Sequence, residues 1–289
     1  MDKAQNEFCI MTTGYKGIQV LKKLKSKPKV VISYENGEGF YEDIKNWCSN
    51  HLVEFYRRDE VKLSALDVDY FFLVGWQYFV DLDKDTKVFV IHDSKLPESR
   101  GFCPTVSSLI QGRSTLAASC FIPQESNVGP DFGTVIDIRT KDIHYPIKLK
   151  EAFDIVSDLS AEIISSYTPN QPAINIDWEK STFSVWRDEN DFCIDWNESS
   201  DKIKRQIDAT GYPYRGSTTH YDENMIRVME SSEWSDLFIE DRNKHIGKTW
   251  KLDDGCPVVI CGKGLLKIEV ALDESDQLID FSKVRKRFR

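Results

Sequence analysis

The sequence has no apolar run that could cross a membrane. Its longest such run, around residues 70–76, is far shorter than the roughly 20 residues that a membrane-spanning helix requires. Residues 1–7 are polar and partly acidic, so they lack the basic start and the apolar stretch of a secretory signal. We therefore expect a cytoplasmic protein with no membrane span.

Cysteine patterns that bind metals are also missing. The seven cysteines are spread along the chain, no Cys-x-x-Cys pair occurs, and no histidine lies at the spacing of a zinc site. Scattered cysteines in odd number are typical of reduced core side chains, and Cys256 and Cys261 fall in predicted strands. The sequence thus predicts reduced cysteines and no bound metal.

Positive charge is in short supply. The 289 residues include 38 Lys and Arg against 47 Asp and Glu, which gives a net charge of −9. This balance argues against nucleic acid as a partner, because counterion release requires a basic surface. The one basic cluster, residues 283–289, is expected to be a solvated tail, with an anion-binding arm as the alternative. With 40% hydrophobic residues, the composition is that of an ordinary soluble globular protein.

In its first half the chain alternates strand-like and helix-like segments. Continuous apolar strands in this pattern are typical of a mainly parallel sheet with helices on both faces. We therefore expect an α/β fold with a Rossmann-like sheet. The predicted strands are residues 8–11, 29–34, 52–56, 70–74, 87–91, 117–122 and 134–138, and the predicted helices are residues 18–24, 41–51, 105–111 and 148–167.

A second, smaller domain is expected after the proline-containing segment 168–172, which cannot continue a helix. We place the boundary so that the domains are residues 1–180 and 181–289. The second domain has a predicted helix at residues 200–209 and hairpin-type turns between its strands. Its predicted strands, residues 225–229, 249–252, 257–261 and 265–270, indicate a small β-rich, barrel-like domain.

The candidate site lies at the carboxyl edge of the sheet, where open α/β folds bind ligands. The predicted strand 87–91 delivers His92 to this edge, and the loop 125–133 can bring Asp131 there. A carboxylate beside a histidine favours the imidazolium and fixes its orientation. Ser94 has no Gly-x-Ser-x-Gly around it, so a loop hydrogen bond suits it better than a nucleophilic role.

Two other segments at this edge carry weaker signals. Residues 14–17 could present helix N-terminal amides to an anion, although a helix start that needs glycine explains them better. Trp76, Gln77, Tyr78 and Phe79 follow a predicted strand, and they either stack on a flat heterocycle or anchor the turn.

Two motifs at the edge resemble one known family. Residues 92–104, His-Asp-Ser-Lys-Leu-Pro-Glu-Ser-Arg-Gly-Phe-Cys-Pro, resemble the Asn-x-His-x-Ser-x-Leu-Pro motif, with its trailing Arg-Gly and Pro, of the formyltransferases that use 10-formyltetrahydrofolate. Residues 131–133, Asp-Phe-Gly, resemble the family's Asp-Thr-Gly loop, 39 residues after His92. Residues 193–197, 211–216 and 258–266 resemble its C-terminal barrel-like domain.

The resemblance implies a reaction and a formyl donor. In the family, the amine of an acceptor attacks the formyl carbon of 10-formyltetrahydrofolate, and an Asn, a His and an Asp support the oxyanion and the proton transfers. His92 and Asp131 would take the histidine and aspartate roles. The donor would dock near Trp76, Gln77, Tyr78 and Phe79 and along Asn127, Val128 and Gly129, and the acceptor would contact Ser94, Arg100 and Pro104.

One position departs from the family pattern. Val90 stands where the family has its Asn, and valine cannot donate a hydrogen bond to an oxyanion. Either a backbone amide or Ser94 replaces that donor, or the enzyme is slower, or the chain binds folate or a nucleotide sugar without catalysis. Because His92, Asp131 and the Leu-Pro loop are all present, we favour an active enzyme.

The family acts on charged tRNA or on small amines such as nucleotide-linked aminosugars. The net charge and Glu98 disfavour a polyanion, and residues 144–148 resemble the sugar-acting members. We therefore expect an N-formyltransferase for a nucleotide-linked amino-deoxysugar, of the kind used in lipopolysaccharide and other surface polysaccharides. Methionyl-tRNA formylation is the alternative, with a basic face from Lys22, Lys23, Lys25, Lys27 and the C-terminal cluster. Exposed strand edges in the small domain predict a homodimer.

Overall fold

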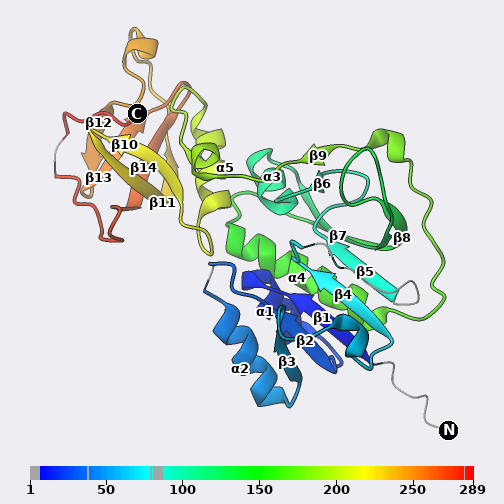
Figure 1. Ribbon diagram of the computed structural model, residues 1–289. Helices are drawn as coiled ribbons and strands as arrows, with labels where there is room; N and C mark the ends of the chain where they lie inside the picture. The colour runs from blue at the N-terminus through cyan, green and yellow to red at the C-terminus, as the bar shows by residue number, and fades with distance from the viewer. Residues whose placement is uncertain (1–6, 38, 79, 81–86, 283) are drawn as a thin grey trace. The chain divides into compact units, whose positions relative to one another are not determined.

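The computed structural model describes residues 7–37, 39–78, 80, 87–282 and 284–289 (Figure 1). Backbone contacts divide the chain into two compact units. The first unit comprises Met1–Thr105, Thr115–Asp142 and Phe153–Val185, and the second comprises Val106–Ser114, Ile143–Ala152 and Trp186–Arg289. The domains expected at 1–180 and 181–289 stay a prediction, since a division by contacts does not test independent folding. Within the described residues, no helix combines the length and apolarity needed to cross a membrane.

A seven-stranded sheet forms the frame of the first unit, in the order β3-β2-β1-β4-β5-β7-β8 (Figure 1). The first five of these are parallel, and β7 and β8 are antiparallel to their neighbours. This confirms the mainly parallel sheet. The strands are β1 (Phe8–Thr12), β2 (Val30–Ser33), β3 (Glu54–Arg57), β4 (Tyr70–Val74), β5 (Lys87–His92), β7 (Thr115–Pro123) and β8 (Gly133–Asp142).

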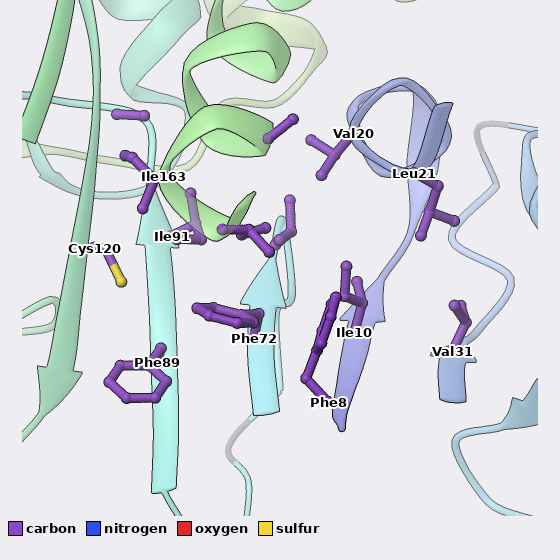
Figure 2. Packing of buried hydrophobic residues seen from close by; sticks show 14 of the residues in the cluster. Phe8, Ile10, Val20, Leu21, Val31, Phe72, Phe89, Ile91, Cys120 and Ile163 are labelled. Carbon is purple, nitrogen blue, oxygen red and sulfur yellow. The ribbon is translucent and has the colours of Figure 1, made fainter. Parts of the chain in front are cut away.

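One face of this sheet packs against the helices α1 (Gly14–Lys23), α2 (Tyr41–His51) and α4 (Leu149–Ser166). Figure 2 shows side chains of Phe72, Phe89 and Ile10 from the strands below those of α1 and α4. Because β1, β2 and β4 are buried along their whole length, both of their faces are apolar, as their continuous hydrophobic sequences predict.

The opposite face of the sheet differs from the expectation of helices on both faces. Its buried cluster is Cys9, Met11, Val30, Ile32, Phe71 and Leu73. The side chains that pack on this cluster come from the short 3₁₀ helix η1 (Leu63–Ala65), the residues next to it, and Trp76, Val80, Val88 and Val90. Short connections therefore cover this face, and it is the face on which Val90 and, two residues later in the same strand, His92 lie.

Two very short strands lie beyond β5, and the sequence analysis did not anticipate them. They are β6 (Arg100–Gly101) and β9 (Phe183–Ser184), which pair in parallel, and the 3₁₀ helix η2 (Trp178–Lys180) precedes β9. The helix α3 (Pro104–Ile110) follows β6. This pairing ties the residues after His92 to a segment more than 80 positions later in the chain.

The second unit holds a five-stranded antiparallel sheet in the order β10-β11-β14-β13-β12. Its elements are η3 (Glu189–Phe192), α5 (Ser200–Thr210), β10 (Ser217–Tyr221), β11 (Asn224–Trp234), η4 (Arg242–Lys244), β12 (Thr249–Asp253), β13 (Cys256–Ile260) and β14 (Leu265–Leu272). Ile203 and Ile207 of α5 join the same buried cluster as Val228 and Ile268. The predicted helix and strands of this region are confirmed, and β10 is additional.

The end of the chain closes this sheet. Phe288 forms a bridge with Tyr221 at the end of β10, and Arg287 forms one with Lys248 beside β12, so the last residues join the two edge strands. The Phe288 side chain is 1% exposed and packs against Trp196 and Tyr221. The expectation of a solvated C-terminal tail was therefore wrong, because the buried phenylalanine outweighs the basic residues around it. The barrel-like character is confirmed.

Candidate functional site

The imidazole of His92 lies between two oxygen atoms of the protein. Its Nε2 is 2.9 Å from the carbonyl oxygen of Ser99, and its Nδ1 is 3.5 Å from Oδ2 of Asp131. A carbonyl oxygen can only accept, so Nε2 carries a proton and donates it. Nδ1 therefore faces the carboxylate, and that contact is favourable when this nitrogen also carries a proton. The two residues predicted from sequence are thus brought together.

Asp131 reaches His92 by a route that the sequence analysis did not foresee. In the register of β5 with β7, His92 lies opposite Ser119 and Val90 opposite Phe121, so β7 runs away from the carboxyl edge. The loop after β7 starts at Pro123, roughly 13 Å from His92 at about 3.3 Å per residue. The loop must return toward His92 before β8 begins.

Asp131 is held at this place by a backbone amide. The N–H of Gly101 donates to Oδ2 of Asp131 over 2.8 Å, and the Asp131 backbone has φ +52°, in the left-handed region that Asp tolerates better than most residues. The distance from Asp131 Oδ2 to His92 Nδ1, 3.5 Å, is longer than that of an ordinary N–H···O hydrogen bond. Catalytic hydrogen bonds are often this long without substrate, so the spacing is compatible with a catalytic pair.

The guanidinium of Arg100 is enclosed by the protein. Arg100 is 1% exposed, and its Nε and Nη2 donate to the carbonyl oxygens of Pro130 and Gly129, each over 2.8 Å. Nη1 donates to Ser181 Oγ over 3.2 Å. Burial lowers the pKa of Arg100, while the negative charge of Asp131 raises it. The three N–H donors of Arg100 bond to oxygen atoms of the protein, which argues against the predicted contact between Arg100 and substrate.

Backbone bonds fix the segment that carries Arg100. The Arg100 N–H donates to the Thr182 carbonyl and the Phe102 N–H to the Ser184 carbonyl, each over 2.9 Å. Gly101 has φ +100°, and a Cβ there would lie 2.4 Å from the Ser184 oxygen. Only glycine fits, which explains the Arg-Gly dipeptide in structural terms.

The other predicted acceptor contacts, Ser94 and Pro104, are both buried. The Ser94 hydroxyl donates to the Glu98 carbonyl over 2.5 Å, and the Ser94 carbonyl accepts from Ser119 Oγ over 2.6 Å. Pro104 begins α3. Their roles toward substrate stay predictions.

A buried ion pair next to His92 was missed by the sequence analysis. Lys16, in the first turn of α1, pairs with Asp93, and the two side chains are 10% and 12% exposed. The only sequence signal was the segment 14–17, considered there as an anion cradle. The anion that Lys16 binds is a carboxylate of this chain, placed by the strand that also carries His92.

Two of the residues predicted to hold the formyl donor, Trp76 and Tyr78, form an aromatic cluster with Tyr34. The ring of Tyr34 lies 5.2 Å from that of Trp76 and 4.8 Å from that of Tyr78, and the Arg58 guanidinium lies 3.6 Å from the centre of Tyr78. Trp76 Nε1 is buried without a hydrogen-bond partner. Tyr34 and Arg58 were not predicted. Trp76 packs on the same sheet-face cluster as Val90.

The remaining predicted donor contacts are less defined. Gln77 is exposed, and Phe79 lies outside the described residues. Asn127 and Val128 are exposed in the loop after β7, and the carbonyl of Gly129 accepts the bond from Arg100.

Val90 offers no polar replacement at its position. Its side chain is partly buried and packs against two apolar clusters, of which Leu73 and Phe121 are members. Among the cysteines, burial raises the pKa of Cys48 and Cys261 to about 12, so these thiols stay protonated at neutral pH.

Comparison with known families identifies the C-terminal part of the chain. Residues 187–289 match the family model described as "Formyl transferase, C-terminal domain". Among curated proteins, the chain is 23% identical over 237 residues to a methionyl-tRNA formyltransferase of Rickettsia bellii, an alignment that covers 78% of this chain and 73% of that protein. The match to the enzyme of Rickettsia africae spans 60% of that protein.

Solved structures share the fold over nearly the whole chain. The crystal structure of WlaRD, a sugar 3N-formyltransferase, determined with dTDP and 5-N-formyl-THF, has a TM-score of 0.63 and 13% identity and covers 92% of this chain and 98% of that one. An N-formyltransferase from Helicobacter canadensis, in complex with folinic acid and dTDP-3-aminofucose, has a TM-score of 0.61 and 15% identity over 92% and 99%.

Proposed function

We propose that this chain transfers a formyl group from 10-formyltetrahydrofolate to the amine of a nucleotide-linked amino-deoxysugar, which the match of residues 187–289 to the formyl transferase C-terminal domain supports. The observation that carries the proposal is the contact between His92 Nδ1 and Asp131 Oδ2. Two residues from separate motifs, 39 positions apart in sequence, meet as the resemblance requires.

In this reaction the acceptor nitrogen bonds to the formyl carbon, the bond from that carbon to the folate nitrogen breaks, and one proton passes from the acceptor to the folate nitrogen. In the proposed mechanism, His92 stabilises the negative charge that develops on the formyl oxygen, and Asp131 takes part in the proton transfer. His92 protonated on both nitrogens presents positive charge where the formyl oxygen becomes negative. Asp131 keeps the imidazolium in place and accepts the acceptor's proton, directly or through water.

The aromatic cluster fits the folate. A pterin is a flat heterocycle, and Tyr34, Trp76 and Tyr78 offer ring faces and edges, with Trp76 packed on the same sheet-face cluster as Val90. Trp76 Nε1 is a buried donor without a partner, which a ring nitrogen or carbonyl of the ligand would satisfy. Arg58 offers a cation for the carboxylates of the glutamate moiety.

The choice of acceptor is supported by charge and by coverage. A net charge of −9 opposes a tRNA backbone. Two of the cations expected to form a basic face are paired with carboxylates: Lys23 with Asp158, and Lys286 with Asp222. The sugar formyltransferases match 98% and 99% of their length. We propose a reaction in the cytoplasm, and a homodimer remains a prediction.

The test is a mass-spectrometric assay of the purified protein with 10-formyltetrahydrofolate and a panel of dTDP-, UDP- and GDP-linked amino-deoxysugars. We expect one sugar to gain a formyl group, and the gain to disappear in His92→Gln. His51→Gln is the matched control, because His51 is a helix residue whose Nδ1 bonds to the Trp47 carbonyl outside the site. Loss of activity in both variants, or in neither, would contradict the assignment.

Methionyl-tRNA formylation is the second candidate, favoured by the curated sequence relatives. The same assay with charged initiator tRNA separates the two. Formylation of tRNA at rates above those for every sugar would replace our proposal.

A third candidate is a non-catalytic binding protein, motivated by Val90. A silent wild-type protein that binds folate, together with turnover in Val90→Asn, would favour it. We expect an active wild type in which Val90→Asn costs stability, since an amide would enter a site between two apolar clusters.

A further inference from the structure

Three consecutive residues hold both members of the proposed catalytic pair. The Ser99 carbonyl accepts from His92 Nε2, and the Gly101 N–H donates to Asp131 Oδ2. Between them, the side chain of Arg100 binds the carbonyl oxygens of Gly129 and Pro130, the two residues that precede Asp131. The geometry of His92 relative to Asp131 therefore depends on one short segment.

The loop that carries Asp131 needs such a hold. It leaves β7 at Pro123, four residues past Ser119, which lies opposite His92, so it has to return toward His92, and it contains no helix or strand of its own. Val128 is 72% exposed at its tip, so little apolar burial fixes the loop. The two carbonyl bonds to Arg100 and the amide bond from Gly101 hold the loop at Asp131 and the two residues before it, while Phe132 after it accepts from the Gln124 N–H and packs on Trp178.

Arginine is suited to this task, and lysine is not. The guanidinium is planar and offers its donors in fixed directions, so one side chain meets carbonyls from Gly129 and Pro130 and the hydroxyl of Ser181 together. The rings of Phe132, Trp178 and Phe183 lie within 5.7 Å of the guanidinium carbon and exclude water from it. An ammonium group is a point charge that cannot satisfy three acceptors in one plane at these positions.

A role in stability alone does not account for this arrangement. The acceptors of Arg100 are neutral, so its charge is buried without a carboxylate in direct contact, which is costly. The charged group that acts on Arg100 is Asp131, whose field raises the pKa of the arginine. The charge of Arg100 and two of its three hydrogen bonds thus act on the loop that carries Asp131.

We propose that Arg100 is a positioning residue, which fixes Asp131 against His92 and does not contact substrate. For its kinetic part the proposal rests on the proposed function. A misplacement of a catalytic group by about 1 Å can cost roughly 100-fold in rate. Arg100→Lys is therefore expected to lower kcat about 100-fold while KM for the folate and for the sugar changes less than about threefold.

A double-mutant cycle separates positioning from general damage. Asp131→Asn is nearly isosteric, and asparagine also tolerates the left-handed backbone at this position. If Arg100 acts through Asp131, Arg100→Lys has little further effect on kcat once Asp131 is already Asn. Independent, multiplicative losses would overturn the proposal.

The second readout does not depend on activity. The ring ¹⁵N chemical shifts of His92 report which groups face its nitrogens, and we expect Arg100→Lys to change them in the direction that Asp131→Asn does. Arg242→Lys is the matched control, because Arg242 is also shielded, with a side chain 17% exposed, and binds the carbonyls of Cys261 and Gly264 in the second unit. It should leave the His92 shifts and kcat unchanged.

The two readouts distinguish the failure of this proposal from that of the function. A wild type without formyl transfer would refute the proposed function, while the ¹⁵N shifts would still test Arg100. If Arg100→Lys does not fold, Arg100→Gln serves as the second variant, since its amide can donate to one of the carbonyls. A folded variant at position 100 with wild-type His92 shifts would overturn the proposal.

Discussion

Arg100, which is 1% exposed, and Arg242, whose side chain is 17% exposed, serve the two units of the molecule in different ways. Arg100 binds carbonyls of Gly129 and Pro130, about 30 positions away, and the hydroxyl of Ser181, 81 positions away. Arg242 binds carbonyls of Leu237, Cys261 and Gly264, all within 22 positions, and the carboxylate of Asp236. The same side chain thus joins distant segments in one unit and neighbouring turns in the other.

The difference lies in what each arginine holds. Around Arg242 the bonded segments flank η4 and the turn after β13, so the contacts stabilise the barrel itself. Around Arg100 the bonded loop carries Asp131, which has an exposed approach and contacts His92. We therefore expect substitutions in the first unit's site to change rates, and substitutions in the barrel core to change stability.

The largest effect is expected at Asp131. Asp131→Asn keeps the shape but removes the negative charge and the base, and a positioned general base contributes about 10²- to 10⁴-fold. Steady-state kinetics should show a fall of kcat in this range with a melting temperature close to the wild type. Asp137→Asn is the control, since Asp137 is similarly shielded, with 17% exposure against 19%, but pairs with Arg139. If Asp137→Asn lowers kcat by a comparable factor, the rate loss in Asp131→Asn does not come from the contact between Asp131 and His92.

The barrel counterpart is Phe288. Phe288→Ala removes a fully buried ring that packs against Trp196 and Tyr221, and such changes cost about 3–5 kcal/mol. Urea unfolding should show this loss, while kcat per folded molecule stays near the wild-type value. Phe238→Ala, at a side chain 95% exposed, should change stability by less than about 0.5 kcal/mol. If both variants are equally stable, the C-terminal closure does not contribute.

Much of the first unit was predictable because its signals are local. Continuous apolar runs identified β1, β4 and β5, and α2 was predicted with the bounds that it has, Tyr41–His51. His92 could be predicted because it follows an apolar strand directly. Asp131 was found through its motif, and the register of β7 shows that its position could not have been derived from the order of strands.

What the sequence did not show depends on partners far away in the chain. The strands β6 and β9 have two residues each, too few for any periodicity, and they exist because they pair. Arg100 was expected to contact substrate, because nothing local reveals that its acceptors are at 129, 130 and 181. Phe288 was not predicted as a core residue for the same reason, because it lies among basic residues and packs against Trp196 and Tyr221, which are far away in the chain.

A smaller effect is expected at Arg58. Arg58→Met removes the cation proposed to pair with the carboxylates of the folate, and an exposed ion pair contributes about 0.2–1 kcal/mol, so the Kd for folate should rise by at most about fivefold. Fluorescence titration measures this, and the melting temperature should not change. Lys251→Met removes a cation over the ring of Trp234 in the second unit and should leave folate binding unaltered. Equal affinities in the wild type and Arg58→Met would place the folate elsewhere.

The smallest effect is a pH dependence within α5, which carries two aspartates with opposite shifts. Burial raises the pKa of Asp208 despite the ion pair with Lys204, so its contribution to stability is present below its ordinary pKa, near 3.9, and is lost as pH rises through the higher folded value. A hydrogen bond from Ser199 lowers the pKa of Asp201, whose contribution is present above its ordinary pKa and is lost as pH falls.

Asparagine at either position removes the titration, so the two variants should diverge in opposite directions. Between pH 3 and 6, the stability of the wild type relative to Asp208→Asn should fall as pH rises, and relative to Asp201→Asn it should rise. Urea midpoints at several pH values measure both differences. If both stability differences change with pH in the same direction, burial does not control the pKa of Asp208. If they change in opposite directions and kcat at neutral pH is unchanged, Asp201 and Asp208 contribute, like Arg242, to the stability of the second unit and not to the rate.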